Sequence, residues 1–249
     1  MTEALEIAAE HAALVGQLRA AGRPYRNPTG ENDSYTGSGR PFFHVKAPEL
    51  RAIARAWLTA HRGASDSDLL ALVDALFAGA HHEEKTLAAV VLGYSARTRR
   101  AATTAKVDAW LDELTGWAEV DSLCAGAFTA AELAGDWPAW RALVERLSGD
   151  PNINRRRAAL VLLTAPTRTS DDLRFRDLGF AVIERLKGER AILITKAVSW
   201  LLRSMAMRHA EAVAAYLDAE SATLPAIAVR ETRTKLLTGT KSGRSAMAR

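Results

Sequence analysis

Trp117 and Asp121 lie four residues apart in GWAEVDSLCAG, residues 116–126, at the start of an apolar run. In a helix this spacing places both side chains on one face. An aromatic ring beside a carboxylate, near the N-terminus of a helix, could hold a cation or a transition state that develops positive charge. The alternative is that Trp117 belongs to the core and Asp121 only interacts with the helix dipole. Taken alone, this stretch favours the alternative.

The elements that would position these residues are amphipathic helices that recur in pairs. Candidate first helices begin near Ser67, Thr104, Trp137, Ser170 and His209, and candidate second helices begin near His82, Trp117, Asn152, Arg190 and Pro225. Each series advances by roughly 35 residues without strand signals, which is typical of stacked helical hairpins of the HEAT or armadillo type. We therefore predict an all-α, right-handed solenoid of HEAT-like repeats that forms one domain over residues 1–238.

Four other segments complete this expectation. An amphipathic helix is predicted over residues 3–21, and a second one begins at Pro48, with Trp57 in its buried stripe. Between them, residues 22–47 form a long loop rich in Gly, Pro and basic residues, which either follows a phosphate backbone or is simply solvated. Residues 239–249 have no apolar period and are expected to be a disordered basic tail.

Composition narrows the class of protein. With 48% hydrophobic residues the chain can bury a large core, and the sequence pI is about 9.4 with far more arginine than lysine. This bias fits a nucleic-acid partner, but a GC-rich genome would produce it equally well. Cys124 is the only cysteine and is expected to be an inert packing thiol. We see no secretory signal, membrane-spanning run, metal-ligand motif or phosphate-binding loop, so we expect a cytoplasmic protein without metal or cofactor.

The N-terminal halves of the second helices share a basic character. They contain Lys85, then Trp117 and Asp121, then Arg155, Arg156 and Arg157, then Lys196, Trp200 and Arg203, and finally Arg230, Arg233 and Lys235. If these helices line the concave face, that face is basic and carries two tryptophans and one carboxylate, a surface suited to a duplex backbone. Scaffolds for other proteins also use such stacks.

Several segments resemble the AlkD-type DNA alkylation repair glycosylases. The matching segments are YTGSGRPFFHVKAPELR at 35–51, GWAEVDS at 116–122, NINRRRAAL at 152–160, KAVSWLLR at 196–203 and VRE at 229–231. The resemblance implies an active site of Trp117, Asp121 and Trp200, with Arg157 on a flanking phosphate and Tyr35 against the DNA. The chain departs from the family at Gly116, where an aromatic pair is usual, and at residues 43–45, where Phe-His-Val stands for Phe-Leu-Gly.

The resemblance also implies a reaction, the hydrolysis of the N-glycosidic bond of N3- or N7-alkylated purines in duplex DNA. Asp121 and the two tryptophans would stabilise the cationic sugar, and Arg156, Lys196, Arg203 and Arg230 would hold DNA. We expect a monomer that associates with the nucleoid when it is bound to DNA. The alternative is a non-catalytic helical-repeat protein that binds DNA structures or a protein partner.

Overall fold

The computed structural model describes residues 5–23 and 36–243, and every regular element in these residues is a helix. This confirms the all-α prediction. The chain divides into two compact units, residues 1–128 and 129–249. The prediction that residues 1–238 form one domain stays a prediction.

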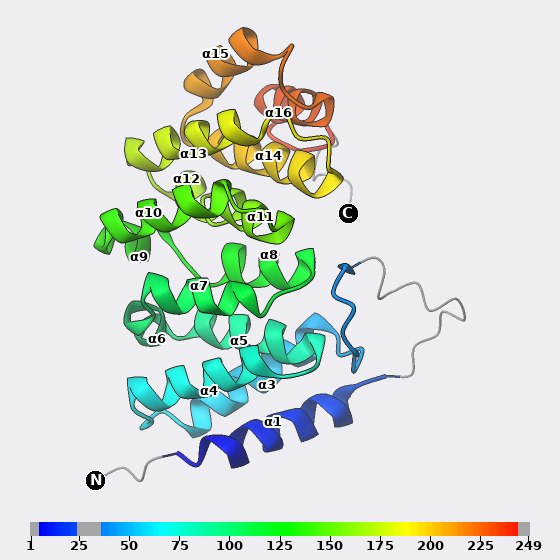
Figure 1. Cartoon of the computed structure of the whole chain (residues 1–249), viewed down its shortest axis with the longest axis vertical. Coiled ribbons are helices and arrows are strands. Elements are labelled where there is room, and N and C mark those ends of the chain that lie inside the picture. The colour runs from blue at the N-terminus through cyan, green and yellow to red at the C-terminus, as the bar shows by residue number, and fades with distance from the viewer. Residues whose placement is uncertain (1–4, 24–35, 244–249) are drawn as a thin grey trace. The chain divides into compact units, whose positions relative to one another are not determined.

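The first unit contains two layers of helices (Figure 1). Its described helices are α1 (Ile7–Ala21), α3 (Ala47–Ala60), α4 (Asp66–Ala78), α5 (His82–Tyr94), α6 (Ala96–Ala101), α7 (Thr104–Asp112) and α8 (Trp117–Gly126). In one layer α4 packs against α1 and α7, and in the other α5 packs against α3 and α8. In this layer α5 and α8 are the predicted second helices of their pairs, and α3, which was predicted as a single helix before the pairs begin, packs against α5.

The second unit repeats this arrangement. Its described helices are α9 (Ala130–Gly135), α10 (Trp137–Ser148), α11 (Ile153–Val161), α12 (Thr164–Thr169), α13 (Leu173–Leu186), α14 (Ile192–Met205), α15 (Ala210–Glu220) and α16 (Ala226–Thr238). Here α10 packs against α13 in one layer, while α14 packs against α11 and α16 in the other. The paired helices of both units confirm the helical-repeat fold.

Local sequence explains where many of the helices begin. Ser65 caps α4 by accepting a hydrogen bond from the amide of Asp68, whose carboxylate in turn accepts from the amide of Ser65. Thr103 and Asn152 cap α7 and α11 through their side-chain oxygens. Short polar side chains satisfy amide groups that otherwise have no partner at a helix start. These caps account for the agreement between predicted and observed starts.

The predictions missed some boundaries and some elements. The first helix starts at Ile7 rather than at residue 3, and α13 starts at Leu173 rather than near Ser170. The short helices α6, α9 and α12 were not predicted. Each has six residues, fewer than two turns, so an apolar period cannot become visible in the sequence.

Candidate functional site

Trp117 and Asp121 lie in the first half of α8. Gly116 is the N-cap, Trp117 is the first helical residue and Asp121 follows one turn later. Both side chains are half-buried. By contrast, Trp57 is only 5% exposed, which confirms its predicted place in the core, and Trp110 and Trp140 are similarly buried. Trp117 therefore differs from the core tryptophans, because part of its side chain remains accessible.

Gly116 allows the chain to approach the start of α8 very closely. A β-carbon at this position would lie 2.5 Å from the carbonyl oxygen of Thr36 and 2.8 Å from the amide nitrogen of Ser38. Both distances are shorter than a β-carbon tolerates, so only glycine fits here without a shift of the backbone. The departure from the family pattern at Gly116 thus has a structural role, which is to let residues 36–38 pack against α8.

Residues 36–46, which precede α3 and are called the entry segment here, are fixed by a buried carboxylate on α8. Glu119 is 1% exposed. Its Oε1 accepts a hydrogen bond from the Ser38 hydroxyl and lies 3.1 Å from Nδ1 of His82. Its Oε2 accepts from the amide of Thr115 at 3.0 Å. Burial raises the pKa of Glu119, but the hydrogen bonds from His82, Ser38 and Thr115 outweigh burial and leave the pKa below its usual value.

A second buried carboxylate holds the other end of the entry segment. Glu83, on α5, accepts hydrogen bonds from the backbone amides of Phe43 at 3.0 Å and Val45 at 3.2 Å. Between these two amides, His44 has a φ of 60°, a left-handed conformation that costs a non-glycine residue about 1 kcal/mol. The two hydrogen bonds to Glu83 thus hold a turn that the residue type does not favour.

Sequence reasoning did not single out Glu83 or Glu119. A signal exists for Glu119, since it shares a helix face with Leu123, which is fully buried. A carboxylate on an apolar helix face needs hydrogen-bond donors from elsewhere in the fold. The sequence does not reveal which donors these are.

Lys85 corrects the predicted basic surface. Its side chain is fully buried and donates a hydrogen bond to the carbonyl oxygen of Phe77, at the end of α4. Burial, together with the neighbouring charge of Arg40, lowers its pKa to about 8. Lys85 therefore belongs to the interior of the first unit and not to a surface that could meet DNA.

In the second unit, Arg157 and Trp200 lie on helices that pack together, α11 and α14. Arg157 is 5% exposed and its Nη1 donates to the carbonyl oxygen of Leu193 at 2.5 Å. Trp200 is half-buried, and Lys196, one turn earlier on α14, is exposed. The tryptophan and the lysine share one face of α14.

Two of the predicted DNA contacts are paired with carboxylates. Arg156 forms a two-pronged ion pair with Glu189, with N–O distances of 2.7 and 3.1 Å. Nε of Arg203 lies 3.4 Å from the Glu231 carboxylate. Arg230 is exposed, and neither it nor Lys196 forms a side-chain hydrogen bond or ion pair within the described part of the chain. The DNA-binding role of all four residues stays a prediction. Of these four, only Arg230 and Lys196 could bind a phosphate without first breaking an ion pair.

Tyr35 lies outside the described residues, as do residues 244–249 of the expected tail. In the described part of that tail, Lys241 lies 3.3 Å from the Glu231 carboxylate. Cys124 is buried, in agreement with a packing thiol. Across residues 5–23 and 36–243, no group of three His, Cys, Asp or Glu side chains could hold a metal ion, and no helix is long and apolar enough to cross a membrane.

Comparisons with known proteins agree with this fold. The model of a family described as DNA alkylation repair enzyme matches residues 16–236. Among solved structures, a predicted DNA alkylation repair enzyme from Enterococcus faecalis is similar, with a TM-score of 0.66 and 19% sequence identity; the match covers 84% of this chain and 96% of that one. No curated protein matches the sequence.

Proposed function

Because the chain belongs to the DNA alkylation repair enzyme family, we propose that it is a DNA glycosylase that hydrolyses the N-glycosidic bond of N3- or N7-alkylated purines in duplex DNA. The observation that supports this activity most is the pair at the start of α8. Trp117 and Asp121 lie one turn apart and both are half-buried. An accessible tryptophan beside an accessible carboxylate suits a reaction in which positive charge develops.

The protein does not have to supply an acid that protonates the leaving base. An N3- or N7-alkylated purine is already cationic, so it departs as a neutral base without a proton from an acid. The barrier lies in the sugar, which becomes an oxocarbenium ion as the bond breaks. Asp121 stabilises this cation through its negative charge and accepts a proton from the attacking water.

The aromatic residues act on the same cation. The ring faces of Trp117 and Trp200 carry partial negative charge, and each contributes roughly 0.5 to 2 kcal/mol to cation stabilisation, depending on desolvation. Removal of water around them strengthens the contribution. No cofactor or metal is needed for this hydrolysis.

Positively charged side chains of the second unit hold the DNA backbone in this proposal. Arg157 contacts a phosphate near the lesion, and Lys196 and Arg230 contribute exposed charge. Arg156 and Arg203 contribute only if phosphate replaces the carboxylates of Glu189 and Glu231, with which they are now paired. Arg156 and Arg203 therefore contribute less to the free energy of DNA binding than their positive charges alone suggest.

Glu119 serves as the internal contrast to Asp121. It lies two residues away on the same helix, but it is 1% exposed and accepts hydrogen bonds from three chain segments. A carboxylate bound in this way holds the fold and cannot reach a substrate. Of the two carboxylates, only Asp121 therefore takes part in the proposed reaction.

The test measures release of 7-methylguanine and 3-methyladenine from methylated duplex DNA. We expect wild-type protein to release both bases, and Asp121→Asn to release them at least about tenfold more slowly while its affinity for DNA stays nearly unchanged. Lys196→Ala is the matched control, since it should weaken binding and reduce its salt dependence without removing the carboxylate. Equal rates for wild type and Asp121→Asn would exclude Asp121 from the mechanism.

The same assay separates the alternative function. Steep salt dependence of duplex binding without any base release by wild type would favour a non-catalytic protein that binds DNA structures. The ion pairs of Arg156 with Glu189 and of Arg203 with Glu231 do not favour that alternative. A protein that only binds DNA would bind it most tightly with arginines that are not paired with carboxylates.

A further inference from the structure

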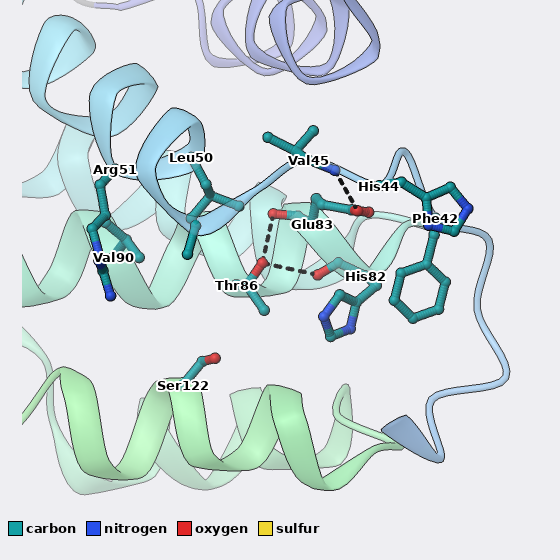
Figure 2. A pocket seen from close by; sticks show the side chains of 11 residues that line it. Phe42, His44, Val45, Leu50, Arg51, His82, Glu83, Thr86, Val90 and Ser122 are labelled. Atoms are coloured by element: carbon teal, nitrogen blue, oxygen red, sulfur yellow. Dashed lines mark hydrogen bonds between the residues drawn. The ribbon is translucent and has the colours of Figure 1, made fainter. Parts of the chain in front are cut away.

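A pocket of about 450 Å³ opens in the first unit between α3 and α8, with α5 as its floor (Figure 2). Leu50 and Arg51 come from α3, Thr86 and Val90 from α5, and Ser122 from α8. Its volume lies within the range of small-molecule sites. Neither Trp117 nor Asp121 lines it, so it is separate from the proposed glycosylase residues.

Arg51 brings to the pocket a positive charge that forms no ion pair within the described part of the chain. Arg51 is exposed and makes no hydrogen bond or ion pair with any residue that the structure describes. The carboxylate that lines the pocket, Glu83, is 3% exposed and accepts hydrogen bonds from the amides of Phe43 and Val45. An anionic group of a ligand would therefore meet an arginine with unused donors.

The opposite end of the pocket is aromatic. His82 and Phe42 stack with their ring centroids 4.5 Å apart, and His44 stacks near Phe42 at 5.7 Å. Figure 2 shows the rings of Phe42 and His82 at one end of the pocket and the Arg51 side chain at the other. A flat, heteroaromatic group suits the ring end of such a site.

The hydrogen bond between His82 and Glu119 determines which nitrogen of the imidazole is a donor and which is an acceptor. Nδ1 lies 3.1 Å from the Glu119 carboxylate, and because an ionised carboxylate only accepts, Nδ1 is the donor. In the neutral ring, Nε2 is then an acceptor, ready for an N–H group of a ligand. The Glu119 carboxylate thus fixes the orientation and the tautomer of the His82 ring, as carboxylates do for ligand-binding histidines.

Two hydroxyl groups add further acceptors. The Ser122 hydroxyl donates to the carbonyl oxygen of Ala118 at 2.7 Å, and the Thr86 hydroxyl donates to that of Glu83 at 3.2 Å. Each oxygen keeps lone pairs for a donor from a ligand. Leu50 and Val90 supply apolar surface between these polar groups.

We propose that this pocket binds one nucleotide unit, with the phosphate at Arg51 and the base at the ring end formed by His82 and Phe42. The arginine supplies charge-assisted hydrogen bonds to the phosphate. The base contacts the aromatic rings through its flat face, and the acceptors on His82, Thr86 and Ser122 match the amino and imino groups of a base. The nucleotide comes either from an unpaired position in a DNA strand or from free nucleotide, because the ligand chemistry is the same.

The first experiment titrates the protein with 2′-deoxyguanosine 5′-monophosphate while the ring signals of His82 are followed by NMR. We expect the nucleotide to shift these signals and to bind at least about fivefold more tightly than deoxyguanosine, which lacks the phosphate. Arg51→Ala should weaken nucleotide binding at least about fivefold. Arg55→Ala, one turn along α3 and outside the pocket, should change it by less than about twofold. An unshifted His82, or equal losses in the two variants, would overturn the proposal.

A second arm identifies the source of the nucleotide. Wild type and Arg51→Ala are compared on a fully paired duplex and on the same duplex with one unpaired nucleotide. A loss in Arg51→Ala that is at least about fivefold larger for the unpaired site assigns the pocket to DNA, and equal losses assign it to free nucleotide. The result is independent of glycosylase activity, since nucleotide binding without release of methylated bases would refute the proposed function and keep the pocket.

Discussion

The most deeply buried charges are mainly carboxylates in the first unit, whereas in the second they are guanidinium groups. Glu83, Glu84 and Glu119 are 1–3% exposed, and they accept hydrogen bonds from amides, hydroxyls and imidazoles of an irregular segment and its surroundings. Arg155 and Arg157 are 7% and 5% exposed, and they donate to an aspartate and to a backbone carbonyl.

This difference teaches that charge in the sequence is not the same as charge available to a ligand. In both units the buried groups satisfy the fold, because a buried charge without partners costs several kcal/mol. The accessible charges are others, such as Arg51 in the first unit and Lys196 and Arg230 in the second. Stability measurements should therefore respond to the buried set, and binding measurements to the accessible set. Arg157 is the exception, because it is buried and the proposed function also assigns it a phosphate contact.

The largest expected effect on stability is that of Glu119→Ala. The substitution leaves Ser38, His82 and the amide of Thr115 without their acceptor, which should lower the free energy of unfolding by about 3–5 kcal/mol. Urea denaturation followed by circular dichroism measures it. Glu211→Ala, an exposed glutamate on α15, is the control and should cost less than about 0.5 kcal/mol. A loss below about 1 kcal/mol at Glu119 would show that buried carboxylates do not organise the first unit.

The corresponding change in the second unit is Arg155→Ala. Arg155 donates from Nε to the Asp150 carboxylate at 2.8 Å, and its removal should cost about 2–3 kcal/mol in the same denaturation experiment. Arg141→Ala breaks an exposed ion pair with Glu145, one helix turn away, and should cost about 0.5 kcal/mol. Similar losses for both arginines would remove the distinction between buried and exposed guanidinium groups.

Gly116→Ala tests how tightly the entry segment packs on α8. The new methyl group would collide with the backbone of Thr36 and Ser38, so we expect a loss of about 1–3 kcal/mol. Gly126→Ala, at the other end of α8, meets no atom within 4 Å and should be neutral or stabilising by up to about 1 kcal/mol. The contact would be refuted if the two variants melted at the same temperature.

The smallest effect is a change in the acid dependence of stability. The pKa of Glu119 lies below its usual value of 4.5 in the folded protein, so the unfolded chain binds the proton more tightly. The stabilisation is complete above the unfolded pKa and is lost as the pH falls through the folded value. Glu119→Gln should reduce the slope of unfolding free energy in this range by up to about 1.4 kcal/mol per pH unit. Urea titrations between about pH 6 and pH 3 measure the slope, and Glu211→Gln should leave it unchanged.

Much of the fold could be predicted because its signals are local. Caps such as Ser65 and Asn152 stand beside the helices that they start, and the apolar stripe that contains Trp57 repeats within a few turns. The pair Trp117 and Asp121 was visible for the same reason, since a spacing of four residues defines a helix face.

The parts that could not be predicted depend on distant partners. Glu119 binds Ser38, 81 residues earlier, and Arg156 binds Glu189, 33 residues later. Lys85 was expected at the surface because it lies in the N-terminal half of a predicted second helix, but the carbonyl oxygen that it binds belongs to α4. Local periodicity contains no information about such pairs, so the basic surface was predicted to be larger than the accessible charges make it.

The long reach of Glu119 also affects the order in which the first unit folds. Stacked helix pairs have mostly local contacts and can form as the chain emerges from the ribosome. The entry segment is different, since its hydrogen bonds at Phe43 and Val45 require α5 and its hydrogen bond at Ser38 requires α8. It is synthesised early but waits for residues made about 40 to 80 positions later. The segment before α3 is therefore among the last parts of this unit to reach its native position, although it is among the first to be translated.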